Sequence, residues 1–267
     1  MKRLIFLVGA KALDAAGYLA ALVNLFLEAV ASIFINWGKG KSIALDNIIM
    51  QILFTGVEAI PLLSIMGLMI GSIVIIQSTT LAPNFGAGQF LGKIMVIGVI
   101  RELGPLVTAF IVIGRSGAAL STYLGNMKIT SELDALEVMG IDPVHVRVMP
   151  ALIGFIVAIT GLTLFFDAVA VLGGYLFSRL LVSLPLMVFM QIILEELSYV
   201  DIIISLFKCL LFGSVISIVS CYHAMNISTS FQEVPQATIR AVVHSIVFSV
   251  FLNMIVTVMF YANFVPV

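Results

Sequence analysis

Ionisable side chains within long apolar stretches are the residues of this chain best placed to do chemistry. Arg101 and Glu102 are neighbours in one such stretch, and Asp167 lies within another. A charge is costly to place in lipid, so such side chains normally face a protein interior or a wet cavity and mark functional positions. The sequence leaves two interpretations open. Either Arg101 and Glu102 line a cavity in which the guanidinium binds a phosphate, or Arg101 forms a structural ion pair with Asp167 or Glu102.

Two more charges, Asp201 and Lys208, share one apolar stretch and lie on one helical face, about two turns apart. We interpret them as structural or interfacial. The histidines are His145, His223 and His244, and their spacing matches no metal-ligand motif. No nucleophile stands beside a candidate base, and the sequence contains no P-loop of the Gly-x4-Gly-Lys-Ser/Thr type. We therefore predict no catalytic residue and no metal site in this chain.

A short acidic segment, residues 131–140, separates two of the apolar stretches. Ser131 is a suitable helix N-cap, and Asp134 three residues later makes a variant of the capping box. Gly140 suits the end of a helix, and Pro143 prevents its continuation. The segment is therefore predicted to form a short helix with defined ends.

The predicted helix carries both acidic and apolar residues. Leu133, Leu136 and Met139 recur every three residues and fall roughly on one face. An exposed apolar face with strong caps is typical of a helix that docks into the groove of a partner, whereas the alternative is a solvated connector. The docking residues would be Glu132, Leu133, Asp134, Leu136, Glu137, Met139 and Gly140.

The composition indicates which solvent surrounds the protein. The chain has 267 residues, of which 61% are hydrophobic and 10% charged, and its net charge is -1. Soluble domains usually carry about 25% charged residues, so we predict an integral membrane protein. The apolar stretches are continuous over roughly 20 residues or more, as in membrane-crossing helices and unlike the alternating strands of barrels. The small net charge gives no support to a nucleic-acid partner.

The apolar stretches predict an all-α protein with five transmembrane helices, at about residues 48–80, 92–121, 148–178, 200–222 and 241–264. Glu58 and Pro61 predict a kink or a short broken piece in the first of them. Residues 12–35 are also apolar, but polar and charged side chains interrupt them. We therefore expect residues 1–47 to form an N-terminal interfacial helix and a linker, and residues 48–267 to form the membrane domain.

The distribution of positive charge predicts the orientation. Lys and Arg concentrate in cytoplasmic segments of membrane proteins. With a cytoplasmic N-terminus, only Lys93 and Arg179 would lie outside, and the C-terminus would be periplasmic. The acidic segment 131–140 is then cytoplasmic. The residues that would lie inside are Lys2, Arg3, Lys11, Lys39, Lys41, Arg115, Lys128, Arg147 and Arg240.

Small residues in the first span predict close helix contacts. Gly67 and Gly71 form a G-x-x-x-G pattern, which lets two helix backbones approach. We favour packing within one chain over a homodimer seam. Together with Leu68, Ile75 and Ile76, Gly71 is also a candidate wall of an outward-opening lipid cavity in a dimer, the alternative being lipid-facing or core packing.

Three separated motifs resemble those of the MlaE/YrbE family. The longest is GRSGAALSTYLGNMKITSELDALEVMGIDPVHVRVMP, residues 114–150. RELGP precedes it at residues 101–105, and QATIRAVVH follows at residues 236–244. In this order they look like the permease subunits of ABC transporters that move phospholipids or other lipids between membranes. The resemblance covers roughly residues 45–265.

The resemblance implies a homodimeric permease with five spans in the bacterial inner membrane, of the kind that maintains lipid asymmetry in the outer membrane. It implies that residues 131–140 form a coupling helix, which docks into a separate ABC ATPase. That ATPase would bind ATP and Mg, so this chain would be neither an enzyme nor the holder of a cofactor. A periplasmic MCE-domain protein is a further implied partner, and in some systems a STAS-domain protein binds the ATPase.

Two alternatives belong to other functional classes. An ion-coupled secondary carrier would use Arg101, Glu102, Asp167 and Lys208 as an ion relay. Such carriers are commonly built from inverted repeats, and the two halves of this sequence show no internal symmetry. The other alternative is a membrane scaffold that transports nothing.

Overall fold

The computed structural model describes residues 2–35, 41–81, 91–182, 185–228 and 230–264, and within these ranges the chain is helical with short turns. The α-helices are α1 (Lys2–Ile35), α2 (Lys41–Gly56), α3 (Ile60–Leu81), α5 (Gly104–Val112), α6 (Ala118–Ile129), α7 (Glu132–Val138), α8 (Met149–Val182), α9 (Leu186–Glu196), α10 (Tyr199–Met225) and α11 (Glu233–Phe264). A 3-10 turn, η1 (Val57–Ala59), and three π-helical segments, η3 (Ile94–Leu103), η4 (Ile113–Gly117) and η5 (Val144–Val148), lie between them.

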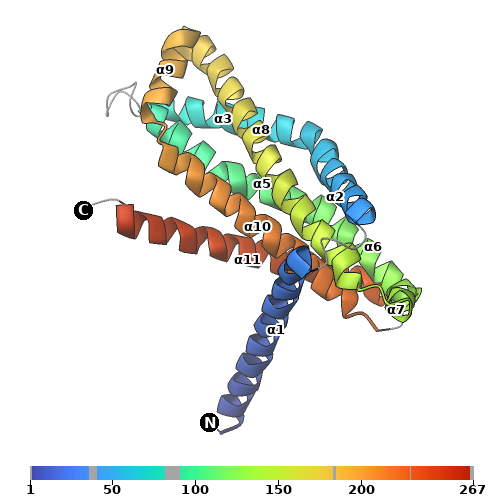
Figure 1. Cartoon of the computed structure of the whole chain (residues 1–267). Helices are drawn as coiled ribbons and strands as arrows, with labels where there is room; N and C mark the ends of the chain where they lie inside the picture. Colours follow the sequence, from blue (N-terminus) through green and yellow to red (C-terminus); the bar gives the residue numbers. More distant parts are fainter. Residues whose placement is uncertain (1, 36–40, 82–90, 183–184, 229, 265–267) are drawn as a thin grey trace.

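Six helical stretches of the described chain are long and apolar enough to cross a membrane: Leu13–Ile33, Leu45–Ser78, Leu91–Ile129, Val144–Leu180, Tyr199–Met225 and Glu233–Phe260. Five of them overlap the spans predicted from the sequence. The sixth lies in α1, where the sequence predicts an interfacial helix. By length and composition alone α1 is able to cross. In Figure 1 it leaves the other helices at a steep angle to α8 and α10.

The helix that contains the second predicted span is longer than that span. The predicted span ends at residue 121, and the helix that contains it continues through α6 to Ile129. Two π-helical segments, η3 and η4, interrupt its regular hydrogen bonding, and such wide turns are frequent at functional sites. Polar residues such as Asn126 and Lys128 therefore extend the helix beyond the apolar stretch instead of ending it.

The predicted break in the first span is confirmed. The chain passes from α2 through the 3-10 turn η1 into α3, with Pro61 in the first turn of α3, where its missing N–H is tolerated. Glu58 in this break forms an ion pair with Arg115 of η4. A charged contact thus joins the first span to the second.

The close packing of α3 on α8 is mediated by glycine. A side chain at Gly71 would collide with the backbone of Ala170, and one at Gly173 would lie 2.6 Å from the carbonyl oxygen of Leu68. The backbones of the two helices are therefore in direct contact along this interface. The G-x-x-x-G pattern that includes Gly67 serves packing within the chain, as expected.

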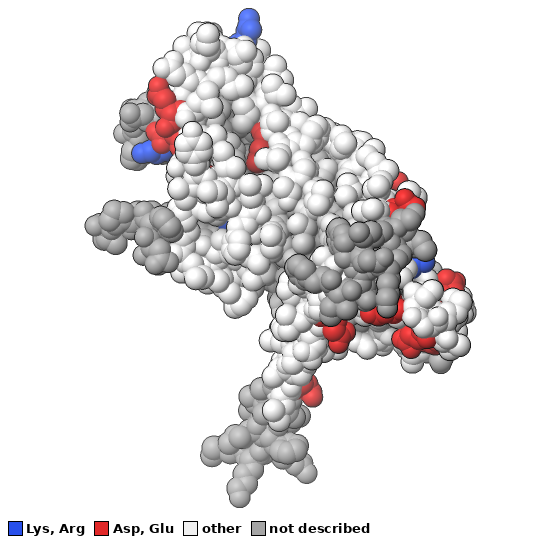
Figure 2. All heavy atoms as spheres, in the orientation of Figure 1, with Lys and Arg blue, Asp and Glu red and all other residues white. Residues whose placement is uncertain are grey.

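Charged side chains gather at two ends of the molecule. In Figure 2 they cluster near α9 and near α7, and the surface between these ends is mostly uncharged. This distribution fits a protein whose middle lies in the hydrocarbon layer and whose ends reach water. We call these two charged ends the α7 end and the α9 end.

Replacing Gly173 by alanine should lower the thermal stability of the chain. The new methyl group would press on the backbone of Leu68, which cannot move aside without separating α3 from α8. Overpacking of this kind costs about 1–3 kcal/mol. Gly161→Ala on the same helix is the matched control, because no atom lies within 4 Å of its added carbon. Thermal unfolding of the purified chain in detergent measures both. Equal midpoints for the two variants would contradict the close contact.

Candidate functional site

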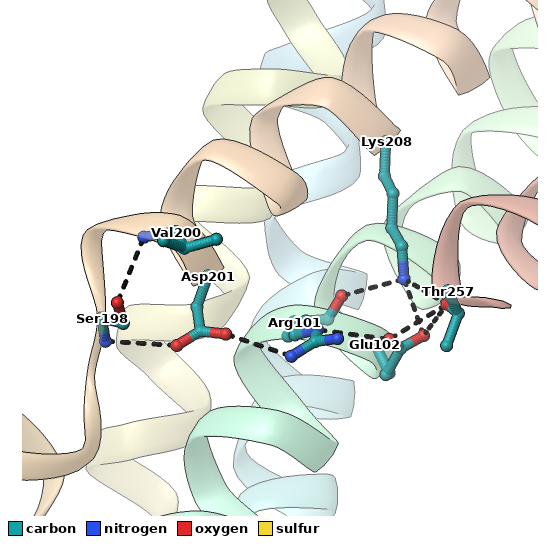
Figure 3. Close-up of polar contacts among 7 residues, drawn as sticks. All are labelled: Arg101, Glu102, Ser198, Val200, Asp201, Lys208 and Thr257. Carbon is teal, nitrogen blue, oxygen red and sulfur yellow. Dashed lines mark hydrogen bonds and ion pairs between the residues drawn. The ribbon is translucent and has the colours of Figure 1, made fainter. Parts of the chain in front are cut away.

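A network of charged side chains joins three helical elements at the α9 end (Figure 3). Arg101 and Glu102 come from η3, Asp201 and Lys208 from α10, and Thr257 from α11. The two cations and two carboxylates alternate, so each positive group has a negative neighbour within 4 Å. The network is therefore balanced in charge.

The ammonium of Lys208 lies at the centre of this network. The residue has 0% exposure, and its Nζ donates to Glu102 Oε2 at 2.7 Å and to Thr257 Oγ1 at 3.0 Å. Nζ also donates to the carbonyl oxygen of Arg101 at 3.4 Å. Pro105, four residues after Arg101, has no backbone N–H to offer that carbonyl. Lys208 thus supplies a hydrogen bond in place of the i+4 donor that Pro105 lacks.

The guanidinium of Arg101 is occupied within the protein. Its Nη1 donates to Asp201 Oδ1 at 3.3 Å, its Nε lies 3.7 Å from Glu102 Oε1, and its carbon lies 3.9 Å from the centre of the Phe260 ring. Asp201 also accepts from the backbone N–H of Ser198 at 3.1 Å, completing the capping box that begins α10. The same carboxylate therefore fixes a helix end and a buried cation.

Of the two ion pairs that the sequence left open for Arg101, the structure contains one. The predicted contact between Arg101 and Glu102 is present, but the alternative with Asp167 is wrong, because Arg101 pairs with Asp201 instead. Sequence analysis interpreted Asp201 and Lys208 as structural or interfacial, and it grouped Lys208 with Arg101 and Glu102 only in the alternative of an ion-coupled carrier. Their seven-residue spacing on one helix was the available signal, since it places both on the face that meets η3.

Asp167 occupies a separate position. Its exposure is 9%, and its Oδ1 has no hydrogen-bond partner. This oxygen lies too close to the position that a Cβ atom at residue 104 would occupy for any residue but glycine to be accommodated there. Gly104 therefore provides the space for the carboxyl group against the second span. The RELGP motif thus contributes to two polar sites, through Arg101 and Glu102 to one and through Gly104 to the other.

The predicted cavity wall divides into two halves. Gly71 and Ile75 are buried against α8, so these two positions pack inside the chain. Leu68 and Ile76 have exposures of 39% and 38% and face outward from the same helix. A lipid-facing role is compatible with the outward pair. The phosphate-binding role of Arg101 and Glu102 stays a prediction, and the contacts above are those of the structural alternative.

The short acidic helix is present as α7, but its N-terminal cap differs from the prediction. Ser131 makes no side-chain capping bond and has φ 60°. The expected capping box is wrong, because Asp134 accepts a hydrogen bond from Lys128 at 2.7 Å. The C-terminal prediction is confirmed, since Gly140 adopts φ 75°, a value that favours glycine.

The apolar stripe of α7 is only partly exposed. Leu133 is 3% exposed and anchors the helix to the membrane domain, and Leu136 is half-buried. Val138 and Met139 are 89% and 65% exposed. The predicted outward apolar face is therefore wrong for Leu133. The surface that α7 offers consists of Val138 and Met139 beside Glu132 and Glu137.

Two polar side chains attach α1 to the other helices. Tyr18 Oη lies 3.0 Å from His223 Nε2 of α10 and 3.1 Å from His244 Nδ1 of α11, and the two ring nitrogens are 2.9 Å apart. Ser32 Oγ lies 2.7 Å from His145 Nδ1 of η5. Every histidine of the chain thus contacts α1. Sequence spacing could not reveal this, because Tyr18 and His244 are 226 residues apart.

The sequence matches a known family model and several known proteins. The model of the permease MlaE family matches residues 48–259. A probable ABC transporter permease protein of Rickettsia prowazekii is 31% identical over 217 residues, which cover 81% of this chain and 84% of that one. The intermembrane phospholipid transport system permease protein MlaE of Haemophilus influenzae is 28% identical over 211 residues, 79% of this chain and 81% of that one. The chloroplastic protein TRIGALACTOSYLDIACYLGLYCEROL 1 of Arabidopsis thaliana is 28% identical over 209 residues, 78% of this chain and 59% of that one.

The central pair of the network should behave as a coupled unit. Glu102→Gln leaves the buried ammonium of Lys208 without its nearest carboxylate, which typically costs about 3–5 kcal/mol. Combining it with Lys208→Met removes both charges and should recover part of that loss. Thermal unfolding in detergent is measured for the unmodified chain, the two single variants and the double variant. Lys93→Met, at an exposed position of the same span, is the control. Strict additivity of the two changes would contradict the coupling.

Proposed function

The chain belongs to the MlaE permease family, and we propose that it is the membrane-spanning subunit of an ABC transporter that moves phospholipids or related lipids between membranes. The observation that carries this proposal is the match over residues 48–259, which includes the charge network and α7 in one continuous stretch. The relative from Haemophilus influenzae is named as a phospholipid permease, and this supports the substrate class.

A separate ATPase would supply the energy, and α7 is the element that we propose it binds. This helix lies at one charged end of the molecule (Figure 1) and carries acidic side chains, and Val138 and Met139 are exposed. Leu133 holds the helix to α6 and to the bundle. Force applied to α7 would therefore pass directly into the second span, which is continuous from Ile129 back to Arg101.

The proposed topology has five crossing helices. The described part of α1 is mostly exposed and diverges from α8 and α10 (Figure 1), which favours a helix lying at the interface. The N-terminus and α7 would then face the cytoplasm of a bacterium and the α9 end the periplasm. The charge bias of the connecting segments supports this orientation.

We further propose a homodimer whose subunits enclose the lipid between exposed apolar helix faces. Leu68 and Ile76 on α3 offer such a surface, and α11 offers another, with only 11% of its span buried. Acyl chains need apolar and shape-tolerant walls of this kind. A periplasmic MCE-domain protein would exchange lipid with the cavity, and a STAS-domain protein on the ATPase is a further proposed partner.

Reconstitution tests the proposed function directly. The chain and its ATPase are incorporated into vesicles that contain a fluorescent phospholipid, and transfer to acceptor vesicles carrying the MCE-domain protein is followed with and without ATP. ATP should accelerate transfer several-fold. Transfer at the same rate with ATP, without ATP and without the permease would reject the function.

A change at the exposed end of α7 should separate the permease from its ATPase. Met139→Asp places a charge on the apolar surface proposed to bind the groove, and burying an unpaired charge at an interface costs several kcal/mol. Met187→Asp on α9 is the matched control, because Met187 is 81% exposed at the opposite end. Co-purification of the ATPase and ATP hydrolysis measure the effect. Equal ATPase recovery with both variants would show that α7 is not the docking element.

A further inference from the structure

A cavity of about 420 Å³ lies between α2, α6 and the segment in which η5 passes into α8. We call it the α2–α6 pocket. Because α6 leads directly into α7 and η5 follows α7, the pocket lies toward the α7 end (Figure 1). Tyr123 in this pocket and Arg101 in the charge network stand at opposite ends of the second span, roughly 30 Å apart at the rise of a helix. The pocket is therefore separate from the charge network, and its volume is typical of ligand sites.

Two amide side chains of α2 are held against the other walls of the pocket. Asn47 Nδ2 donates to the carbonyl oxygen of Val146 at 3.2 Å. Pro150, four residues after Val146, has no backbone N–H to offer that carbonyl. Gln51 lies against α8 at Gly154, where an added Cβ would be 2.6 Å from Gln51 Cγ. The polar part of the wall is thus fixed by contacts between α2 and the η5–α8 segment.

Arg147 brings a positive charge to the pocket. It belongs to the π-helical segment η5, and its guanidinium carbon lies 5.5 Å from the centre of the Tyr123 ring, within the range of a cation–π contact. Its Nε is buried and has no hydrogen-bond partner in the described part of the chain. The cations that pair with a carboxylate are Arg101, Arg115, Lys128 and Lys208. Arg147 is therefore positioned by an aromatic ring, while its buried N–H still needs an acceptor.

The charges around the pocket indicate an anionic ligand. None of the described residues that line it is Asp or Glu. Asp46 and Asp142, which are near its walls in sequence, are exposed and outside the lining. A ligand that carries both a phosphate and an ammonium would find a partner for the phosphate only. The pocket therefore favours a phosphate ester without a positive group of its own.

The remaining wall of the pocket is apolar and faces the bilayer. Met50 and Phe54 are 68% and 43% exposed, and they belong to a helical stretch that is long and apolar enough to cross a membrane. Exposed apolar side chains of such a stretch can contact acyl chains. Basic pockets between transmembrane helices on the cytoplasmic side commonly bind the headgroups of anionic lipids. A cationic site with an apolar outlet matches a lipid better than a soluble phosphate ester.

We propose that the α2–α6 pocket binds an anionic phospholipid of the cytoplasmic leaflet, with its phosphate on Arg147 and its acyl chains along Met50 and Phe54. The Nε and one Nη of a guanidinium form a fork that matches two phosphate oxygens, so the lipid supplies the acceptor that Nε lacks. The oxygens of Asn47 and Gln51 can accept from hydroxyl groups of a glycerol headgroup.

This lipid is a resident ligand and not the transported one. The proposed transport cavity uses Leu68 and Ile76 of α3, and neither residue lines the α2–α6 pocket. A lipid in this pocket would contact α2, α6 and α8 together and so stabilise their arrangement beside α7. The choice of leaflet rests on the orientation proposed above, whereas binding itself needs neither transport nor the ATPase.

Lipid titration of the purified full chain in detergent tests the pocket. After delipidation the chain is titrated with phosphatidylglycerol or with phosphatidylethanolamine, and bound lipid is counted by native mass spectrometry. The unmodified chain should bind phosphatidylglycerol more tightly. Arg147→Gln should weaken phosphatidylglycerol binding about tenfold, as expected for the loss of one charge-assisted hydrogen bond, and should leave phosphatidylethanolamine binding unchanged. Arg179→Gln is the matched control, because Arg179 also contacts a tyrosine, Tyr175, but lies at the α9 end.

A second variant covers the case in which Arg147→Gln does not fold. Ala119→Phe fills the pocket from α6 and keeps the charge of Arg147, and it too should weaken phosphatidylglycerol binding. Undiminished binding in either folded variant would overturn the proposal, as would equal binding of the two lipids by the unmodified chain. Glycerol 3-phosphate is the remaining probe: if it raised the thermal midpoint as much as phosphatidylglycerol, the site would belong to a soluble ester. A chain that selects phosphatidylglycerol but fails to transport lipid would contradict only the proposed function.

Discussion

The ammonium of Lys208 imposes the central constraint on this bundle, because a charge with 0% exposure has to be neutralised by the protein itself. Its three acceptors come from η3 and α11, so one side chain of α10 holds three helical elements in register. The neutralising carboxylate, Glu102, also accepts hydrogen bonds from Asn253 and Thr257 of α11. Displacing any of these helices would expose a charge to a low-dielectric interior, which is strongly unfavourable. The network therefore fixes η3, α10 and α11 relative to one another at the α9 end.

Local wide turns bring the network's residues together. Arg101 and Glu102 are adjacent, and on a regular helix their side chains would diverge by about 100°. In the π-helical segment η3 both nevertheless reach one cluster, Arg101 toward Asp201 and Glu102 toward Lys208. Because Pro105 has no backbone N–H, the carbonyl oxygen of Arg101 accepts a hydrogen bond from Lys208 instead. The irregular backbone and the buried charges are thus parts of one arrangement, and the regular helix resumes in α5.

Sequence patterns were sufficient for the features that depend on local composition. The predicted spans overlap five of the six described helical stretches that are long and apolar enough to cross a membrane. Glu58 and Pro61 located the break between α2 and α3, and Gly140 located the end of α7. Features that depend on contacts between distant helices were out of reach. The pairing of Arg101 with Asp201 rather than Asp167 is set by which helix packs beside η3. The burial of Leu133 is likewise decided by how α7 folds back on α6, and periodicity within α7 does not encode that.

The glycine contact between α3 and α8 has a mechanical consequence. Where two backbones touch, there is no layer of side chains to rearrange, so α3 and α8 have to move as a single rigid body. On the opposite side of the bundle, α11 meets its neighbours through small hydroxyl side chains, whose contacts can be exchanged for water at little cost. Deformation of the permease should therefore concentrate along the half of α11 that lies before Asn253, because Asn253 and Thr257 are held to Glu102, with α3 and α8 as the stiff frame.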